Sequence, residues 1–127
     1  MFKDSKVFSG YSVNNIAAAK EFYQDVLDLE VKDTPMGLKI TFSGSYWIFI
    51  YLKEDHIPAT FTVLNFSVDD INKAVAELNA KDIKFELYEG MNQDEKGIVR
   101  GLSSNRGPDI AWFKDPAGNI LSVLQQK

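Results

Sequence analysis

The chain has 127 residues, of which 45% are hydrophobic, 13% aromatic and 25% charged, and this composition excludes disordered, collagen-like and low-complexity proteins. A formal net charge of −4 argues against a nucleic-acid surface, and the absence of cysteine excludes disulfides and thiolate chemistry. The single histidine, His56, leaves little scope for zinc or histidine-base catalysis, and no apolar run has the length of a membrane span. We therefore expect one globular domain in the cytoplasm that binds neither nucleic acid nor membrane.

The first half of the chain, residues 5–53, is predicted to form a module of one strand, one helix and three further strands. The expected elements, in chain order, are a strand at 6–13, a helix at 16–29 and strands at 30–33, 38–42 and 46–52. Asn15 stands at the N-cap of the helix, and a turn of Ser43, Gly44 and Ser45 joins the last two strands.

The second half, residues 61–126, repeats this order after a polar crossover at 54–60. The pentapeptide Ser-Val-Asn-Asn-Ile at 12–16 recurs as Ser-Val-Asp-Asp-Ile at 67–71. The expected elements are a strand at 61–68, a helix at 71–83 and strands at 84–88, 110–113 and 120–124. Asp69 and Asp70 are interpreted as helix-capping residues rather than an acid/base pair, and His56 as a loop residue rather than a general base.

The second module also carries a glycine-rich insert at 89–109 that the first module lacks. A loop of this length in a compact domain is usually functional or disordered. Both arginines of the chain, Arg100 and Arg106, lie in it. We expect the insert to be a mobile flap that orders over a ligand, with Arg100 as the ligand contact, whereas a solvated loop is the plainer alternative.

The duplicated pattern, together with Asp-Pro-Ala-Gly-Asn at 115–119, resembles the vicinal oxygen chelate superfamily over nearly the whole chain. This superfamily includes glyoxalase I, bleomycin-resistance proteins, extradiol dioxygenases and fosfomycin-resistance enzymes. The resemblance implies an α+β fold of two tandem βαβββ modules, whose sheets curl around a shared cleft with the helices outside. It also implies a homodimer.

The resemblance further implies four positions at which the superfamily holds a divalent metal ion. In this chain they correspond to Phe8, Ile48, Val63 and Ser122. These side chains lack the nitrogen and carboxylate donors that catalytic first-row metal ions require. The expectation is therefore a protein without a metal site or other cofactor.

The same positions define the expected binding cleft. If Phe8 and Ile48 face it, strand alternation adds Ser12 and Tyr46 on the first module and Asn65 on the second, while Trp47 faces the helices. The expected ligand-binding residues are Phe8, Ser12, Tyr46, Ile48, Val63, Asn65, Arg100 and Ser122.

A mostly apolar wall with a few hydroxyl and amide groups suits ligand binding better than bond cleavage. The leading hypothesis is a metal-free protein that sequesters a small molecule, of the bleomycin-resistance type. The alternative is a glyoxalase-like lyase or isomerase, or another enzyme of this superfamily, and a third reading is a structural member without a ligand.

Overall fold

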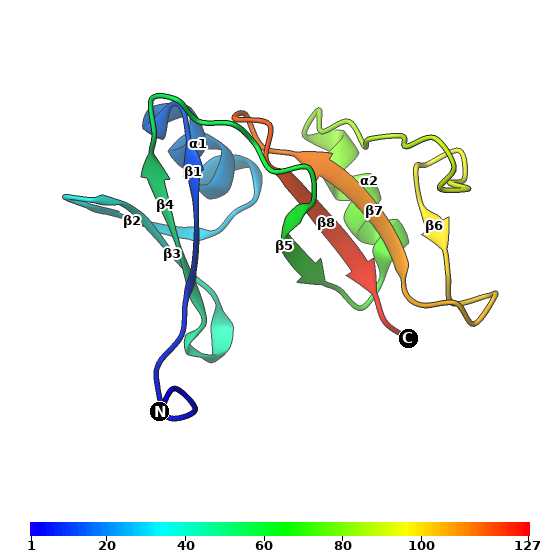
Figure 1. Cartoon of the computed structure of the whole chain (residues 1–127). Helices are drawn as coiled ribbons and strands as arrows, with labels where there is room; N and C mark the ends of the chain where they lie inside the picture. The colour runs from blue at the N-terminus through cyan, green and yellow to red at the C-terminus, as the bar shows by residue number, and fades with distance from the viewer. The chain divides into compact units, whose positions relative to one another are not determined.

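The computed structural model describes all 127 residues and consists of two compact units, Met1–Pro58 and Ala59–Lys127. Each unit contains one four-stranded mixed sheet and one helical segment (Figure 1). The strand orders are β1-β4-β3-β2 and β5-β8-β7-β6, and in both sheets the first strand pairs in parallel with the last. The predicted α+β fold of two repeated modules is therefore confirmed.

The first unit follows the predicted order of elements. They are β1 (Ser9–Val13), α1 (Ile16–Glu21), the π-helical η1 (Phe22–Val26), β2 (Glu30–Thr34), β3 (Gly37–Thr41), the 3-10 turn η2 (Ser43–Ser45) and β4 (Trp47–Leu52). The Asn15 side chain accepts a hydrogen bond from the Ala18 N–H at 2.9 Å, which satisfies a donor of the first helical turn. The helix expected at 16–29 becomes π-helical after Glu21 and ends before Asp28, whose φ of 57° is incompatible with a continuing helix.

The second unit has one element in an unexpected place. Its elements are β5 (Thr62–Ser67), α2 (Ile71–Ala80), β6 (Val99–Arg100), β7 (Asp109–Lys114) and β8 (Ile120–Gln125). Asp70 caps α2 by accepting from the Lys73 N–H at 3.2 Å, as predicted. The strand expected at 84–88 is absent, and the short strand β6 occupies the edge of the sheet instead.

The insert explains this difference. The Glu86 N–H donates to the Trp112 carbonyl oxygen at 2.8 Å, while Val99 and Arg100 pair with Ile110 and Asp109 further along the same edge of β7. Residues 87–98 therefore loop out of what would otherwise be one edge strand, and residues 101–108 form a second loop before β7. The single insert expected at 89–109 is in fact two loops on either side of β6.

The placement of Ile48 contradicts the sequence prediction. Ile48 pairs with Ser9, and Tyr11 on the same side of β1 places its hydroxyl 2.7 Å from the Tyr23 hydroxyl of η1. Ile48 is therefore on the face that packs against the helical segment, where it is 6% exposed. The expectation that Ile48 shares a face with Phe8 was wrong. Successive side chains of a strand point to opposite faces, so an error of one position in the expected register placed Ile48 on the opposite face.

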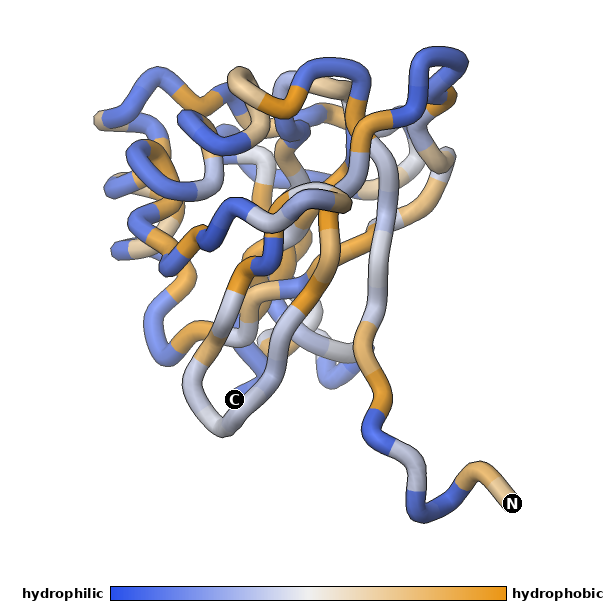
Figure 2. Tube along the Cα trace, turned by 90° about the vertical axis from the view of Figure 1, so that its left-hand side faces the viewer, coloured by the Kyte–Doolittle hydropathy of each residue, from blue (hydrophilic) through white to orange (hydrophobic).

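The core of each unit lies between its sheet and its helical segment. In the second unit α2 lies along β8 and β7 (Figure 1). The hydrophobic residues concentrate along the strands, whereas the connecting loops are largely hydrophilic (Figure 2). The buried apolar side chains include Val13, Phe22, Tyr23, Leu38, Ile40, Ile48 and Ile50 in the first unit and Ile71, Val75, Ile98, Phe113, Leu121 and Val123 in the second.

Candidate functional site

The open face of the first sheet, which is the face turned away from α1 and η1, carries an aromatic stack. The Phe8 ring lies 4.0 Å from the Trp47 ring, centroid to centroid, with an angle of 17° between their planes. The Lys39 ammonium lies 4.5 Å from the Trp47 centroid, within the range of a cation–π interaction. Phe8 remains 54% exposed, so part of this stack is open to contact.

Ser12 lies on this face, whereas Tyr46 alternates with Trp47 and therefore shares the side of Ile48. The Ser12 hydroxyl lies 2.7 Å from Nδ1 of His56, and this contact ties β1 to the chain that follows β4. Tyr46 immediately precedes β4 and is 75% exposed. Trp47, which the sequence placed toward the helices, is on the open face with Phe8.

In the second unit the structure brings Asn65 and Ser122 together. They are register partners on β5 and β8, and the Ser122 hydroxyl donates to Oδ1 of Asn65 at 2.5 Å. Ser122 is completely buried, whereas the Asn65 side chain reaches the surface. Val63 stands at a β-bulge, where the register of β5 shifts between Thr62 and Leu64.

The four positions implied for a metal ion do not fit one. Phe8 and Val63 present only carbon atoms, Ile48 is in the core, and the Ser122 hydroxyl is a weak donor already bonded to Asn65. A divalent catalytic ion requires imidazole or carboxylate ligands at such positions. Moreover, no group of three or more histidine, aspartate or glutamate side chains lies close enough to hold a metal.

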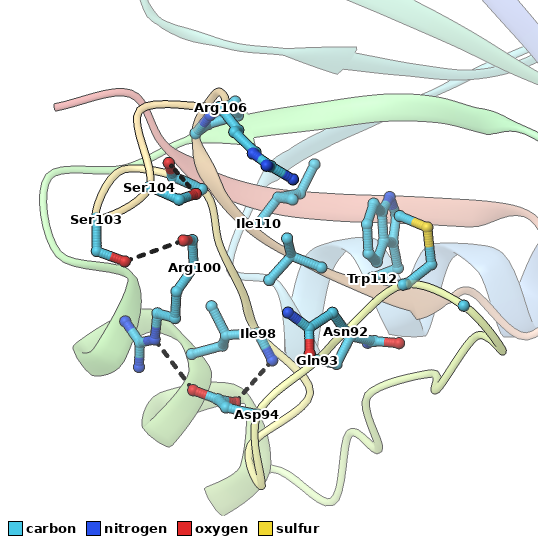
Figure 3. A pocket seen from close by; sticks show the side chains of 15 residues that line it. Asn92, Gln93, Asp94, Ile98, Arg100, Ser103, Ser104, Arg106, Ile110 and Trp112 are labelled. Atoms are coloured by element: carbon cyan, nitrogen blue, oxygen red, sulfur yellow. Dashed lines mark hydrogen bonds and ion pairs between the residues drawn. The ribbon is translucent and has the colours of Figure 1, made fainter.

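The second unit contains a pocket of about 820 Å³ between the insert and the open face of β7 (Figure 3). This volume is in the range that accommodates drug-sized ligands. The lining residues are Gly90, Met91, Asn92, Gln93, Asp94, Ile98, Val99, Arg100, Gly101, Ser103, Ser104, Arg106, Pro108, Ile110 and Trp112. We call this space the insert pocket.

Arg100 lies in the wall of the insert pocket, but its guanidinium has protein partners. Nε donates to Asp94 at 3.0 Å, NH1 lies 3.5 Å from Asp109, and NH2 donates to the Asn72 side chain at 2.6 Å. Asp109 is nearly buried and also accepts from the Leu102 N–H. Arg100 therefore joins the insert to α2 and β7. The sequence analysis, which expected Arg100 to contact a ligand, did not predict these contacts.

Asp94 organises the loop before β6. It accepts hydrogen bonds from the N–H groups of Lys96 and Ile98, both at 2.9 Å, in addition to that from Arg100. Burial alone would raise the pKa of Asp94, but the Ile98 and Lys96 N–H groups and the Arg100 guanidinium outweigh it and hold the pKa below its ordinary value of 3.8. The insert is thus built around an ionised carboxylate.

Arg106 differs from Arg100. Its backbone N–H donates to the Gly101 carbonyl at 2.9 Å, but its guanidinium makes no hydrogen bond or ion pair with the protein. Figure 3 shows the side chain reaching past Ile110 at the edge of the insert pocket, while Arg100 turns toward Asp94. Of the two arginines in the insert, the one with donors to spare is Arg106.

A smaller pocket of about 280 Å³ adjoins the insert pocket, and Met91 and Trp112 line both. Its lining residues are Thr60, Phe61, Thr62, Tyr88, Glu89, Met91, Trp112 and Ile120. The Tyr88 ring packs edge-on against Trp112 with centroids 5.6 Å apart, and its buried hydroxyl has no hydrogen-bond partner. Burial, reinforced by the nearby Glu86 charge, raises the pKa of Tyr88, so the phenol stays protonated.

Sequence reasoning missed this arrangement for identifiable reasons. Trp112 belonged to an aromatic cluster that core packing would also explain, and Met91 was one of the few apolar residues of the insert. The alternation along β7 could have identified Trp112 as a residue of the open face. Ile110 and Trp112 share that face, and Ala111 and Phe113 are buried on the other.

Comparison with known proteins agrees with this fold. The sequence profile of the Glyoxalase/Bleomycin resistance protein/Dioxygenase superfamily matches residues 8–123, so the chain belongs to this superfamily. No curated protein sequence matches the chain. None of its helices combines the length and the hydrophobicity that crossing a membrane requires.

Solved structures share the fold at low sequence identity. The antibiotic binding protein TnmS3 from a Streptomyces species is 17% identical, with a TM-score of 0.67 and 98% of each chain covered. A fosfomycin resistance protein from Listeria monocytogenes is 12% identical, with a TM-score of 0.68 over 98% of this chain and 94% of that one. A lactoylglutathione lyase from Agrobacterium tumefaciens is 20% identical, with a TM-score of 0.65 over 97% and 95% of the two chains.

Proposed function

We propose that the protein binds and sequesters a small organic molecule without a metal ion. The observation that carries this proposal is the insert pocket, in which Trp112, Ile110 and Met91 offer an apolar surface beside a few polar groups. Burial of a planar ligand against such a surface supplies affinity, and the polar groups orient it.

Two further observations support binding over catalysis. The positions that carry metal ligands in the superfamily hold Phe8, Val63 and Ser122, whose chemistry does not fit a divalent ion. In addition, TnmS3, which shares the fold, is an antibiotic binding protein. The fosfomycin resistance protein and the lactoylglutathione lyase share the same fold. An enzymatic function is therefore the alternative against which the proposal is tested.

The proposal is tested by tryptophan fluorescence. The chain has two tryptophans, so Trp47→Phe leaves Trp112 as the only reporter and Trp112→Phe leaves Trp47. Titration with a panel of planar aromatic compounds should quench Trp112 saturably with one ligand per chain. The affinity should be the same before and after treatment with a chelator.

Two results would contradict metal-free binding of a small molecule. One equivalent of tightly held zinc, nickel, manganese or iron after purification, together with turnover of a substrate that the chelator abolishes, would favour the lyase or isomerase alternative. A panel that quenches neither tryptophan at millimolar concentration would favour a structural member without a ligand.

We also propose that the protein is a cytoplasmic homodimer. Each sheet has two edge strands, β1 and β2 in the first and β5 and β6 in the second, that are paired on one side only, and unpaired strand edges favour association unless they are covered.

A further inference from the structure

We infer that the insert pocket selects an organic anion, such as a carboxylate, sulfonate or phosphate ester on a planar apolar body, and that Arg106 is the residue that selects the charge. This inference rests on the proposed binding function and deepens it by naming the ligand class. It is carried by the hydrogen-bond donors and acceptors of the pocket wall.

Asp94, the one acidic residue in the lining of the insert pocket, and the nearly buried Asp109 are already hydrogen-bonded within the protein. Asp94 accepts from two backbone N–H groups and from Arg100, and Asp109 accepts from Leu102 and lies 3.5 Å from the same guanidinium. Arg100 in turn has used donors on Asp94, Asp109 and Asn72. Both carboxylates of this group are therefore engaged within the protein, which weakens their attraction for a cationic ligand.

Most hydrogen-bond donors of the polar side chains in the pocket wall already bond to backbone carbonyl oxygens. Ser103 and Ser104 donate their hydroxyls to the carbonyl oxygens of Arg100 and Gly101, both at 3.2 Å. The Gln93 amide donates to the carbonyls of Glu86 and Gly97. A guanidinium has five N–H donors and no acceptor, so the unpartnered Arg106 leaves the wall rich in donors that only an acceptor group of the ligand can use.

Backbone contacts hold the loop that carries Arg106. Residue 106 is bonded back to Gly101, and a side chain at Gly101 would meet the Pro108 carbonyl oxygen at 2.4 Å. Gly107, with φ of +128°, then turns the chain toward β7. The close approach fixes the backbone on both sides of Arg106, so the base of the side chain is held at the edge of the pocket.

Trp112 and Met91 lie within the same pocket, so an acidic group at Arg106 can belong to a molecule whose ring system covers the apolar part. An anion with no apolar body would gain only a contact screened by solvent, which is worth little. The ligand class is therefore an aromatic or polycyclic acid rather than a free inorganic anion.

The test compares two fluorescent probes with the same framework, 8-anilinonaphthalene-1-sulfonate and its neutral analogue N-phenyl-1-naphthylamine. The wild type should bind one molecule of either probe per chain, and Arg106→Ala should weaken the sulfonate about five- to tenfold, as expected for a partly screened charge-assisted contact. Its affinity for the neutral probe should change less than about twofold, a negligible free-energy difference. Arg106→Lys should recover part of the lost affinity.

Two further variants make the result specific. Lys73→Ala removes an exposed cation on α2, outside the pocket, and should change neither affinity. Trp112→Ala should weaken both probes. If Arg106→Ala weakens both probes equally, or neither, the charge-selection inference is overturned while binding stands. If the wild type binds neither probe at one per chain, the proposed function fails as well.

Discussion

Tyr88 carries a buried hydroxyl that is not expected to stabilise the fold. Its buried hydroxyl makes no hydrogen bond, and leaving such a group unpaired costs about 1–3 kcal/mol. Tyr88→Phe should therefore leave the free energy of unfolding unchanged or raise it by up to about 1 kcal/mol, measured by urea denaturation. Tyr51→Phe, a change on the first sheet, is the control, and a clear loss of stability in Tyr88→Phe would show that the hydroxyl has a structural partner.

Asp94 should make stability depend on pH. Because the pKa of Asp94 is lower in the folded protein than its ordinary value of 3.8, its contribution to stability is complete above that value and is lost as pH falls through the folded pKa. Asp94→Asn should lower the free energy of unfolding at pH 7 by about 1–2 kcal/mol, through loss of a partly exposed charged hydrogen bond to Arg100.

The matched control is Asp55. Its pKa is also lowered, by a hydrogen bond from Lys53, but the pair is exposed to solvent, so Asp55→Asn should not measurably change stability. In denaturation curves recorded from pH 7 to pH 2.5, the gap between wild type and Asp94→Asn should close below pH 3.8. A gap that stays constant over this range would contradict the ion-pair interpretation.

Some single residues could be read from the sequence and others could not. Asn15 and Asp70 were predicted as helix caps, and their hydrogen bonds confirm this, because capping depends on neighbours three residues away. Which of the two arginines has protein partners depends on carboxylates that the fold brings together. Spacing along the chain does not show that Asp94 and Asp109 converge on Arg100, so the sequence alone could not distinguish its guanidinium from that of Arg106.

At the scale of elements, the register of β1 against β4 decides which side chains can meet a ligand. Ile48 is 6% exposed in the core, whereas Phe8 is 54% exposed on the opposite face. Ile48→Ala should therefore lower the free energy of unfolding by about 2–5 kcal/mol. Phe8→Ala should cost about 1 kcal/mol, mainly the stacking on Trp47. Urea denaturation of both variants checks this, and equal losses would mean that the two residues do not lie on opposite faces.

The divided edge strand shows a different limit of sequence analysis. Residues 84–88 have the composition of a strand, and Glu86 does bond to β7, but the loop at 87–98 moves the rest of the pairing to Val99 and Arg100. Strand propensity reports a fit to a pleated surface and does not say where a chain leaves that surface. The pocket beneath the insert exists because of this departure, so it could not be predicted from the repeat.

For the whole molecule, the repeat was the feature that predicted most. Two modules with the same order of elements gave two sheets with the same strand order, since the hydrophobic pattern and the turns recur in both halves. The expected cleft residues were derived from what the two modules share, whereas the insert pocket lies where the second module differs from the first. Of its lining, only Arg100 was named from the sequence as a ligand-binding residue, because the other wall residues are brought together by the two loops on either side of β6.

The repeat also leads to a prediction about assembly. The two sheets each leave one side of β1 or β5 unpaired, and apolar side chains such as Val7 and Phe61 next to these strands are 84% and 68% exposed. A net charge of −4 is too small to oppose an interface of standard size, about 1,600 Å². Sedimentation equilibrium at micromolar concentration should give twice the chain mass of 14.3 kDa. The mass should be unchanged in 0.5 M salt, because apolar contacts rather than charges hold such an interface. A single species of 14.3 kDa would show that the exposed edges are not used for pairing between copies.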